Sequence, residues 1–204
     1  MDDDGADTLM TGSARPPLAF APSAPSTDAL LPETVLRNYL HAKDENRPHI
    51  LDAVFEIDAE LEIRNHSAAI AFPALTRGRS AIADVAVRSF GQTYENVYTF
   101  CLDRPVGPRR HFECGWLVAM TAKVGGTVRV GCGRYDWEFG DRRPHLATRL
   151  VITISAMEML AASTSATILE SIGRLDYPWS SAAQVRSALD RSPALEPVRA
   201  ALVA

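Results

Sequence analysis

The residues of this chain best suited to acid–base chemistry are a histidine and an aspartate. His66 follows a predicted strand, and an imidazole exchanges protons readily near neutral pH. Asp136 is a candidate general base, and Arg134 falls on the same face of its strand, where a guanidinium would hold the carboxyl ionised. If the fold brings His66 and Asp136 into one pocket, that pocket is equipped for proton transfer.

Each of these residues also has a purely structural interpretation. His66 would then be a loop histidine in contact with solvent. Arg134 and Asp136 would form an ion pair on the outer face of a sheet or at a dimer seam, because strand parity does not say which face of a strand looks inward. The structure of the sheet has to decide between the two interpretations.

Aromatic residues are the candidates for ligand binding. Tyr39 lies on a predicted helix, where it is either a core aromatic that bonds a backbone carbonyl or part of a pocket wall. Flat side chains in an apolar pocket would hold a flat, hydrophobic ligand, although the same side chains also serve as packing. The other residues of this kind are Phe72, Tyr98, Trp116, Tyr135 and Trp137.

Composition argues against several classes of function. The net charge of -4 leaves no basic surface for nucleic acid. No stretch is long and apolar enough to span a membrane, and residues 1–7 lack the apolar core of a signal peptide, so we expect a cytoplasmic protein. The 5 histidines and 3 cysteines show neither a CxxC pair nor the clustering of metal ligands, so we expect no metal and no cofactor.

The hydrophobic pattern places these residues on a series of helices and strands. The expected elements are helices over 32–43 and after Pro48, a strand over 55–63, a loop over 65–76, a helix over 79–91, and strands over 94–102, 111–123, 127–139 and 146–156. Ile57 is expected on the apolar face of the first strand, and Ser80 is a candidate cap of the third helix.

The ends of the chain differ from this central part in composition. Residues 1–30 are rich in Asp, Pro, Ser and Ala and are expected to be a disordered tail. Residues 163–204 are expected to form a helical appendage, in which Tyr177-Pro178-Trp179 either anchors the appendage or covers a pocket mouth. The later strands are apolar on both faces, so we expect a homodimer through the sheet.

Two short motifs carry a resemblance to a known family. Gly78-Arg79-Ser80-Ala81-Ile82 opens the third helix, and Gly133-Arg134-Tyr135-Asp136-Trp137 lies on a late strand. With the order of elements, they make residues 31–162 similar to the SnoaL-like branch of the NTF2-like superfamily. The resemblance implies an α+β cone, in which a strongly curved, mostly antiparallel sheet wraps around N-terminal helices. The superfamily has many functions, so the fold alone does not decide the function.

Two enzymes of the superfamily suggest roles for particular residues. When ketosteroid isomerase is laid on 35–63 without a gap, its oxyanion-hole tyrosine falls on Tyr39 and its general base on Ile63. Its second oxyanion donor falls near Tyr135, which has a hydroxyl to donate. Limonene epoxide hydrolase has an Arg-x-Asp pair with the spacing of Arg134 and Asp136, but on an earlier strand.

These observations lead to one main functional hypothesis and two alternatives. The main hypothesis is a cone that binds a small apolar molecule and, if catalytic, performs cofactor-free isomerisation, dehydration or cyclisation of a carbonyl compound. Tyr39 and Tyr135 would then stabilise an oxyanion while Asp136 or His66 moves the proton. The alternatives are a non-catalytic ligand-binding or association module, which the isoleucine at position 63 favours, and a structural subunit of a larger complex.

Overall fold

The computed structural model describes residues 31–189 and 192–202, so the expected tail over 1–30 lies outside the described residues. The chain begins with helix α1 (Pro32–Asp44), and Pro32 stands in its first turn, where a fixed φ and a missing N–H cost nothing. A short 3-10 helix, η1 (Pro48–Ala53), follows. Val35, Leu36 and Leu40 of α1 are fully buried, as their helical spacing predicts.

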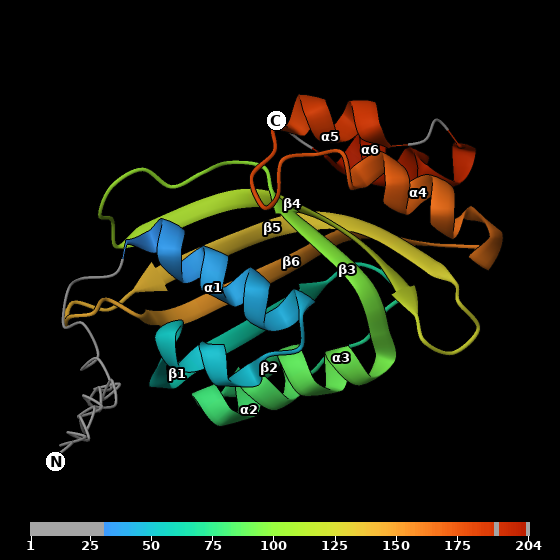
Figure 1. The fold of residues 1–204 in the computed structure, drawn as a ribbon. Helices are drawn as coiled ribbons and strands as arrows, with labels where there is room; N and C mark the ends of the chain where they lie inside the picture. The colour runs from blue at the N-terminus through green and yellow to red at the C-terminus, as the bar shows by residue number, and fades with distance from the viewer. Residues whose placement is uncertain (1–30, 190–191, 203–204) are drawn as a thin grey trace, which may run out of the picture.

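Six strands form one curved, open sheet that supports the rest of the molecule (Figure 1). The strands are β1 (Phe55–Asn65), β2 (Leu75–Arg77), β3 (Tyr94–Cys101), β4 (His111–Ala122), β5 (Val128–Phe139) and β6 (Ala147–Leu160). Their order across the sheet is β2-β1-β6-β5-β4-β3. Only the β1–β6 pair is parallel among these strands, so the sheet is mostly antiparallel, which confirms the α+β fold expected from the sequence.

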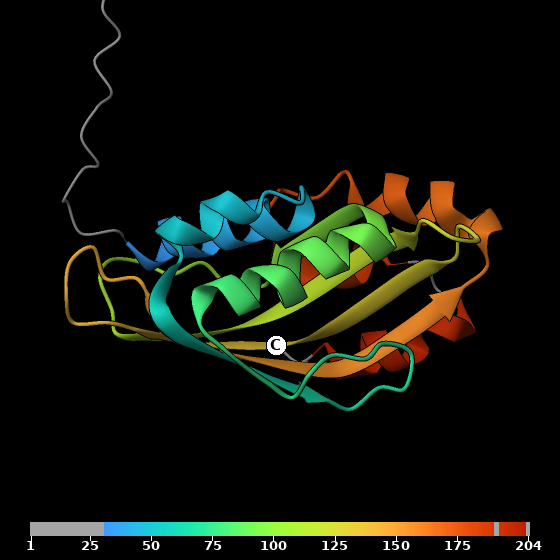
Figure 2. The ribbon, with the colours of Figure 1, turned by 90° about the horizontal axis from the view of Figure 1, so that it is seen from below.

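The segment between β2 and β3 continues as one helical stretch of changing geometry. It consists of α2 (Arg79–Ala83), a π-helical turn η2 (Asp84–Ser89) and α3 (Phe90–Thr93). The expected cap at Ser80 is wrong, because Gly78 holds the N-cap position with a positive φ of 84° and no side chain caps the helix. Helices α1 to α3 all lie on the concave side of the sheet (Figure 2).

Two expectations about the first half of the sheet also need correction. The loop predicted over 65–76 contains the short strand β2, which pairs with residues 60–62 of β1. Ile57 was expected to be buried but is 74% exposed. The pairing of β1 with β6 is interrupted between Phe55 and Glu60, and at this irregularity Ile57 points to solvent while Ala59 stays buried.

The C-terminal residues cover the outer face of the sheet. They form α4 (Ser165–Ile172), α5 (Ala182–Ala188) and α6 (Glu196–Ala201), with short 3-10 turns at Ala162–Thr164 and Pro193–Leu195. Ile172, Val185 and Val198 pack on Leu117 and Val130 in a second hydrophobic cluster. In Figure 2, α5 and α6 (red) lie on the side of the sheet opposite α1 to α3.

This arrangement explains why the later strands are apolar on both faces. Their concave side meets α1 to α3, and their outer side meets the appendage. The apolar outer face, on which the expectation of a homodimer rested, is therefore occupied by the chain itself. Among the helices of the described residues, none is long and apolar enough to cross a membrane.

Candidate functional site

A cavity of about 60 Å³ lies between the concave face of the sheet and the helices that cross it. Four of its lining residues carry a polar group, namely Tyr39, Lys43, Trp116 and Tyr135. The apolar lining residues are Ile63, Ile70, Phe72, Ala86, Phe90, Val118, Met120, Ile152, Ile154 and Met157. A space of this size holds a few water molecules, so a larger ligand requires side chains such as Met157 to move.

Tyr39 projects from α1 into an aromatic cluster at the floor of the cavity. Its ring meets Tyr135 and Trp137 edge to face, with centroids 5.9 and 5.2 Å away. Its hydroxyl is buried and has no hydrogen-bond partner among the described residues. Burial raises the pKa of Tyr39 far above that of a free phenol, so the group keeps its proton and can donate a hydrogen bond.

Trp116 of β4 and Tyr135 of β5 stack beside Tyr39, with ring centroids 5.6 Å apart. The indole Nε1 of Trp116 is buried without a hydrogen-bond partner in the described part of the chain. Burial raises the pKa of Tyr135 well above its usual value, so its phenol also stays protonated. An indole N–H only donates, and a protonated phenol can donate, so the residues that form this wall include buried hydrogen-bond donors.

Gly133 of β5 leaves the room that Trp116 occupies. A Cβ at position 133 would lie 1.8 Å from the carbonyl oxygen of Thr153 and 2.8 Å from the Trp116 ring. At Gly131, a Cβ would meet the Met157 side chain at 2.4 Å. The bare strand face that these glycines create is therefore filled by the protein's own backbone and side chains.

Lys43 is a charged residue of the cavity lining that the sequence analysis did not propose. Its ammonium nitrogen lies 2.7 Å from the Thr99 hydroxyl, 2.5 Å from an Asp44 carboxylate oxygen and 4.9 Å from the centre of the Phe90 ring. A signal for it was present, because Lys43 follows Tyr39 by four residues and such residues share one face of a helix. A lysine at the end of a helix is ordinarily a solvated charge, but here it is buried.

The other residues proposed for catalysis lie elsewhere. His66 is an exposed residue just after β1, and its backbone N–H donates to Ile154 O at 3.0 Å. Asp136 and Arg134 lie on the outer face of β5, because Tyr135 between them points inward to the cavity. The structure thus brings Tyr39, Tyr135, Trp116 and Phe72 together around the cavity and leaves His66, Asp136 and Arg134 outside it.

Trp137 and Tyr98 complete the residues proposed for binding. Trp137 is fully buried and stacks on Phe55 and Phe139, with centroids 5.9 and 6.2 Å away, so it belongs to the core next to the cavity. Tyr98 lies on β3 and is exposed. Neither residue lines the cavity.

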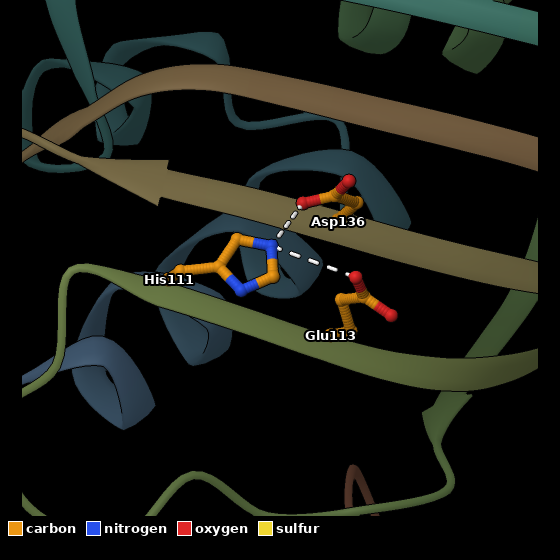
Figure 3. A group of neighbouring side chains, drawn as sticks. All are labelled: His111, Glu113 and Asp136. Atoms are coloured by element: carbon orange, nitrogen blue, oxygen red, sulfur yellow. Dashed lines mark hydrogen bonds and ion pairs between the residues drawn. The ribbon is translucent and has the colours of Figure 1, made fainter.

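Asp136 takes part in a group of charged side chains on the outer face. Figure 3 shows His111 and Glu113 of β4 beside Asp136 of β5, with His111 Nε2 2.7 Å from Asp136 Oδ1 and 3.6 Å from Glu113 Oε1. Among the described residues, these three form the one group of side chains close enough to share a metal ion. Glu113 also accepts a hydrogen bond from Arg134 Nε at 3.0 Å, so the three side chains are part of a polar network on the surface of the sheet.

The arrangement of strands and helices matches solved structures. A hexachlorocyclohexane dehydrochlorinase, LinA type 2, superposes with a TM-score of 0.50 at 16% identity, over 62% of this chain and 84% of that one. A second LinA structure gives 0.50 at 12% identity, over 60% and 82% of the two chains. The chain has the NTF2-like fold.

Other comparisons add little to the NTF2-like assignment. An NTF2-like superfamily protein from Salmonella enterica serovar Typhimurium gives a TM-score of 0.48 at 16% identity, over 61% of this chain and 88% of that one. No protein-family model matches the sequence. No curated protein matches it either. At such identities the likeness establishes the fold alone.

Within the NTF2-like cone, Ile63 lines the cavity at the position where the resemblance to ketosteroid isomerase puts the general base. An isoleucine cannot accept a proton. Among the described residues that line the cavity, none is aspartate, glutamate or histidine. The cavity therefore combines apolar walls and hydrogen-bond donors with one ammonium group.

Proposed function

We propose that this protein binds a small, apolar molecule that carries a carbonyl oxygen, in the cavity of its cone. The observation that carries the proposal is the presence of buried hydrogen-bond donors among the residues that line the cavity. Tyr39 and Trp116 each present a buried polar group without a partner in the described residues. Lys43 adds a cation, and apolar side chains form the remaining lining.

The cost of burying donors without an acceptor supports a ligand of this kind. A buried donor without an acceptor costs about 1–3 kcal/mol. A carbonyl oxygen of a ligand would offer lone pairs to these donors, while the rest of the ligand would bury its surface against side chains such as Ile154 and Met157. A hydrocarbon of the same shape would gain only the second contribution.

We place the binding module ahead of an enzyme because no carboxylate or imidazole lines the cavity in the described residues. A SnoaL-like isomerase, dehydratase or cyclase is the second candidate, and one observation favours it. The phenols of Tyr39 and Tyr135 are protonated donors of the type that stabilises an enolate oxygen. In that case Lys43, paired with Asp44, would move the proton in place of Asp136 or His66.

A titration with matched ligands tests the binding proposal. Cyclohexanone and methylenecyclohexane have the same shape but differ in the carbonyl oxygen, and acetophenone with α-methylstyrene forms a larger pair. Binding is followed by tryptophan fluorescence and by ligand-observed NMR. We expect each ketone to bind more tightly than its alkene, by about two- to tenfold for one hydrogen bond.

The variant Tyr39→Phe is the matched control for this titration. It removes one donor and keeps the aromatic ring, so the preference for the ketone should shrink. Equal affinities for ketone and alkene in the wild-type protein would overturn the proposal, as would an unchanged preference in both Tyr39→Phe and Lys43→Met. A homodimer is a separate proposal, which sedimentation velocity tests.

A further inference from the structure

The ammonium group at the cavity belongs to a buried polar cluster between α1 and β3. Lys43 donates to Asp44 Oδ1 at 2.5 Å and to Thr99 Oγ1 at 2.7 Å. Thr99 in turn donates its backbone N–H to Asp44 Oδ2 at 2.8 Å and its hydroxyl to Oδ1 at 2.9 Å. The Asp44 side chain is only 3% exposed, so its charge depends on these partners.

The C-terminal appendage supplies one more donor to this cluster. The hydroxyl of Tyr177 donates to Asp44 Oδ2 at 3.1 Å. The segment around it runs along the free edge of β3, where Cys101 N donates to Pro178 O at 2.8 Å and Ser180 N donates to Cys101 O at 3.1 Å. The appendage therefore reaches from the outer face of the sheet, around its edge, to the polar end of the cavity.

We propose that Tyr177 is a positioning residue for ligand binding: through Asp44 it fixes the place of the Lys43 ammonium at the cavity wall. The inference rests on the proposed function, since it assigns a positioning residue to the same site. A carboxylate held by donors from β3 and from the appendage has one orientation. The ammonium that bonds to it is then directed toward Phe90 and the cavity.

The appendage has attachments that do not involve the hydroxyl of Tyr177. The appendage is attached mainly by its own hydrophobic cluster on the outer face, which includes Ile168, Ile172 and Leu195. Tyr177 is 46% exposed, and its ring also meets Phe100 edge to face. Tyr177→Phe keeps that ring contact and removes only the bond to Asp44, so it separates positioning from anchoring.

The lysine content of the chain allows a direct test that needs no ligand. Lys43 and Lys123 are the only two lysines, and Lys123 is exposed. Brief acetylation with acetic anhydride followed by peptide mass spectrometry gives the reactivity of Lys43 relative to Lys123 in the same sample. In the wild-type protein we expect Lys43 to react slowly, because its nitrogen is buried and paired.

In Tyr177→Phe, Asp44 loses one donor, and Lys43 should become more mobile and more reactive. We expect the ratio of Lys43 to Lys123 acetylation to rise about two- to tenfold, the change that loss of one hydrogen bond allows. Ser180→Ala is the matched control, because it removes the bond from Ser180 Oγ to Asp176 O in the same segment and leaves Asp44 untouched.

The outcomes separate the inference from the proposed function. A rise in Tyr177→Phe alone supports positioning, and weaker binding of cyclohexanone by this variant extends it to the ligand. An unchanged ratio overturns the inference, and so does an equal rise in Ser180→Ala, which would trace the effect to loosening of the segment. Failure of the wild-type protein to prefer the ketone removes the proposed function, whereas the acetylation ratio still reports whether Tyr177 positions Lys43.

Discussion

The ammonium group of Lys43 donates to the hydroxyl of Thr99 at 2.7 Å, and this bond joins the end of α1 to the edge strand β3. The two residues are far apart in the sequence, and both are buried. The bond places a cation among the mainly apolar residues that line the cavity. It also makes the stability of the protein depend on a polar contact inside the cone.

Thr99→Val should destabilise the protein, because it removes an acceptor from Lys43 and a donor from Asp44 while conserving the shape of the side chain. We expect a loss of about 1–3 kcal/mol in the free energy of unfolding, the range for buried polar groups left without a partner. Urea unfolding followed by circular dichroism measures it. Thr99→Ser keeps the hydroxyl and should lose less; a Thr99→Val variant as stable as the wild type would show that the hydroxyl does not contribute.

Tyr39→Phe should leave the free protein at least as stable as the wild type. The hydroxyl that it removes is buried and has no hydrogen-bond partner in the described residues. Burying such a group destabilises the folded state, and Tyr39→Phe lacks this penalty. We expect a melting temperature equal to or above that of the wild type, measured by scanning calorimetry. A clear fall in the melting temperature would reveal a partner for this hydroxyl and weaken its assignment to a ligand.

Gly133→Ala should be strongly destabilising. The added Cβ would lie 1.8 Å from the Thr153 carbonyl oxygen and 2.8 Å from the Trp116 ring, so the pairing of β5 with β6 has to shift, and the ring with it. Overpacking of this kind costs about 1–3 kcal/mol or more. Gly140→Ala is the control, since its nearest neighbours would be 3.3 to 3.5 Å from the new Cβ. Denaturant unfolding measures the loss of stability in both variants. A small loss in Gly133→Ala would mean that the strand can move to accept the Cβ.

Ion pairs on the outer face of the sheet should make the free energy of unfolding depend on pH and on salt under acidic conditions. Hydrogen bonds from Arg64 and Arg149 lower the pKa of Glu62, and Arg134 lowers that of Glu113. A carboxyl whose pKa is lower in the folded state stabilises the fold at any pH above its unfolded pKa. For glutamate that unfolded pKa is about 4.3. This contribution is lost as the pH falls from there through the lower folded value.

Acid unfolding of Arg149→Gln checks the sign of this dependence. Without Arg149 the pKa of Glu62 should move up toward its usual range, so unfolding should begin at a higher pH than in the wild type. The pairs are partly exposed, hence the effect should be small and should shrink in concentrated sodium chloride. Arg142→Gln, in a turn, is the control; an equal shift in that variant would point to net charge rather than to the pair.

Much of the fold was predictable from the sequence. Helical spacing identified α1, and alternation identified the long strands, because burial against one layer repeats with the period of the element. The bulge at Ile57 and the short strand β2 were not predictable in this way. Both depend on how β1 pairs with its neighbours, and local propensity does not encode that pairing.

The site was predictable only in part. Tyr39, Tyr135, Trp116 and Phe72 were identified by residue type, and all of them line the cavity. Asp136 was proposed for the same site because the sequence shows which residues of its strand share a face. It does not show which of the two faces points into the cavity. Parity shows that Asp136 and Tyr135 point to opposite sides. Only the packing of α1 against the sheet shows that Tyr135 is the one inside.

The sequence by itself therefore indicated the order of the main elements and most of the residues that share each face, and its resemblance to a known superfamily implied the NTF2-like cone. The tertiary structure alone decided which of those faces became the interior, and it alone brought Tyr177 and Thr99 to Asp44 and Lys43. The physical reason is that periodicity is a local property of helices and strands. A buried polar cluster, in contrast, is built from segments that meet only after the sheet has curved and the appendage has passed around its edge.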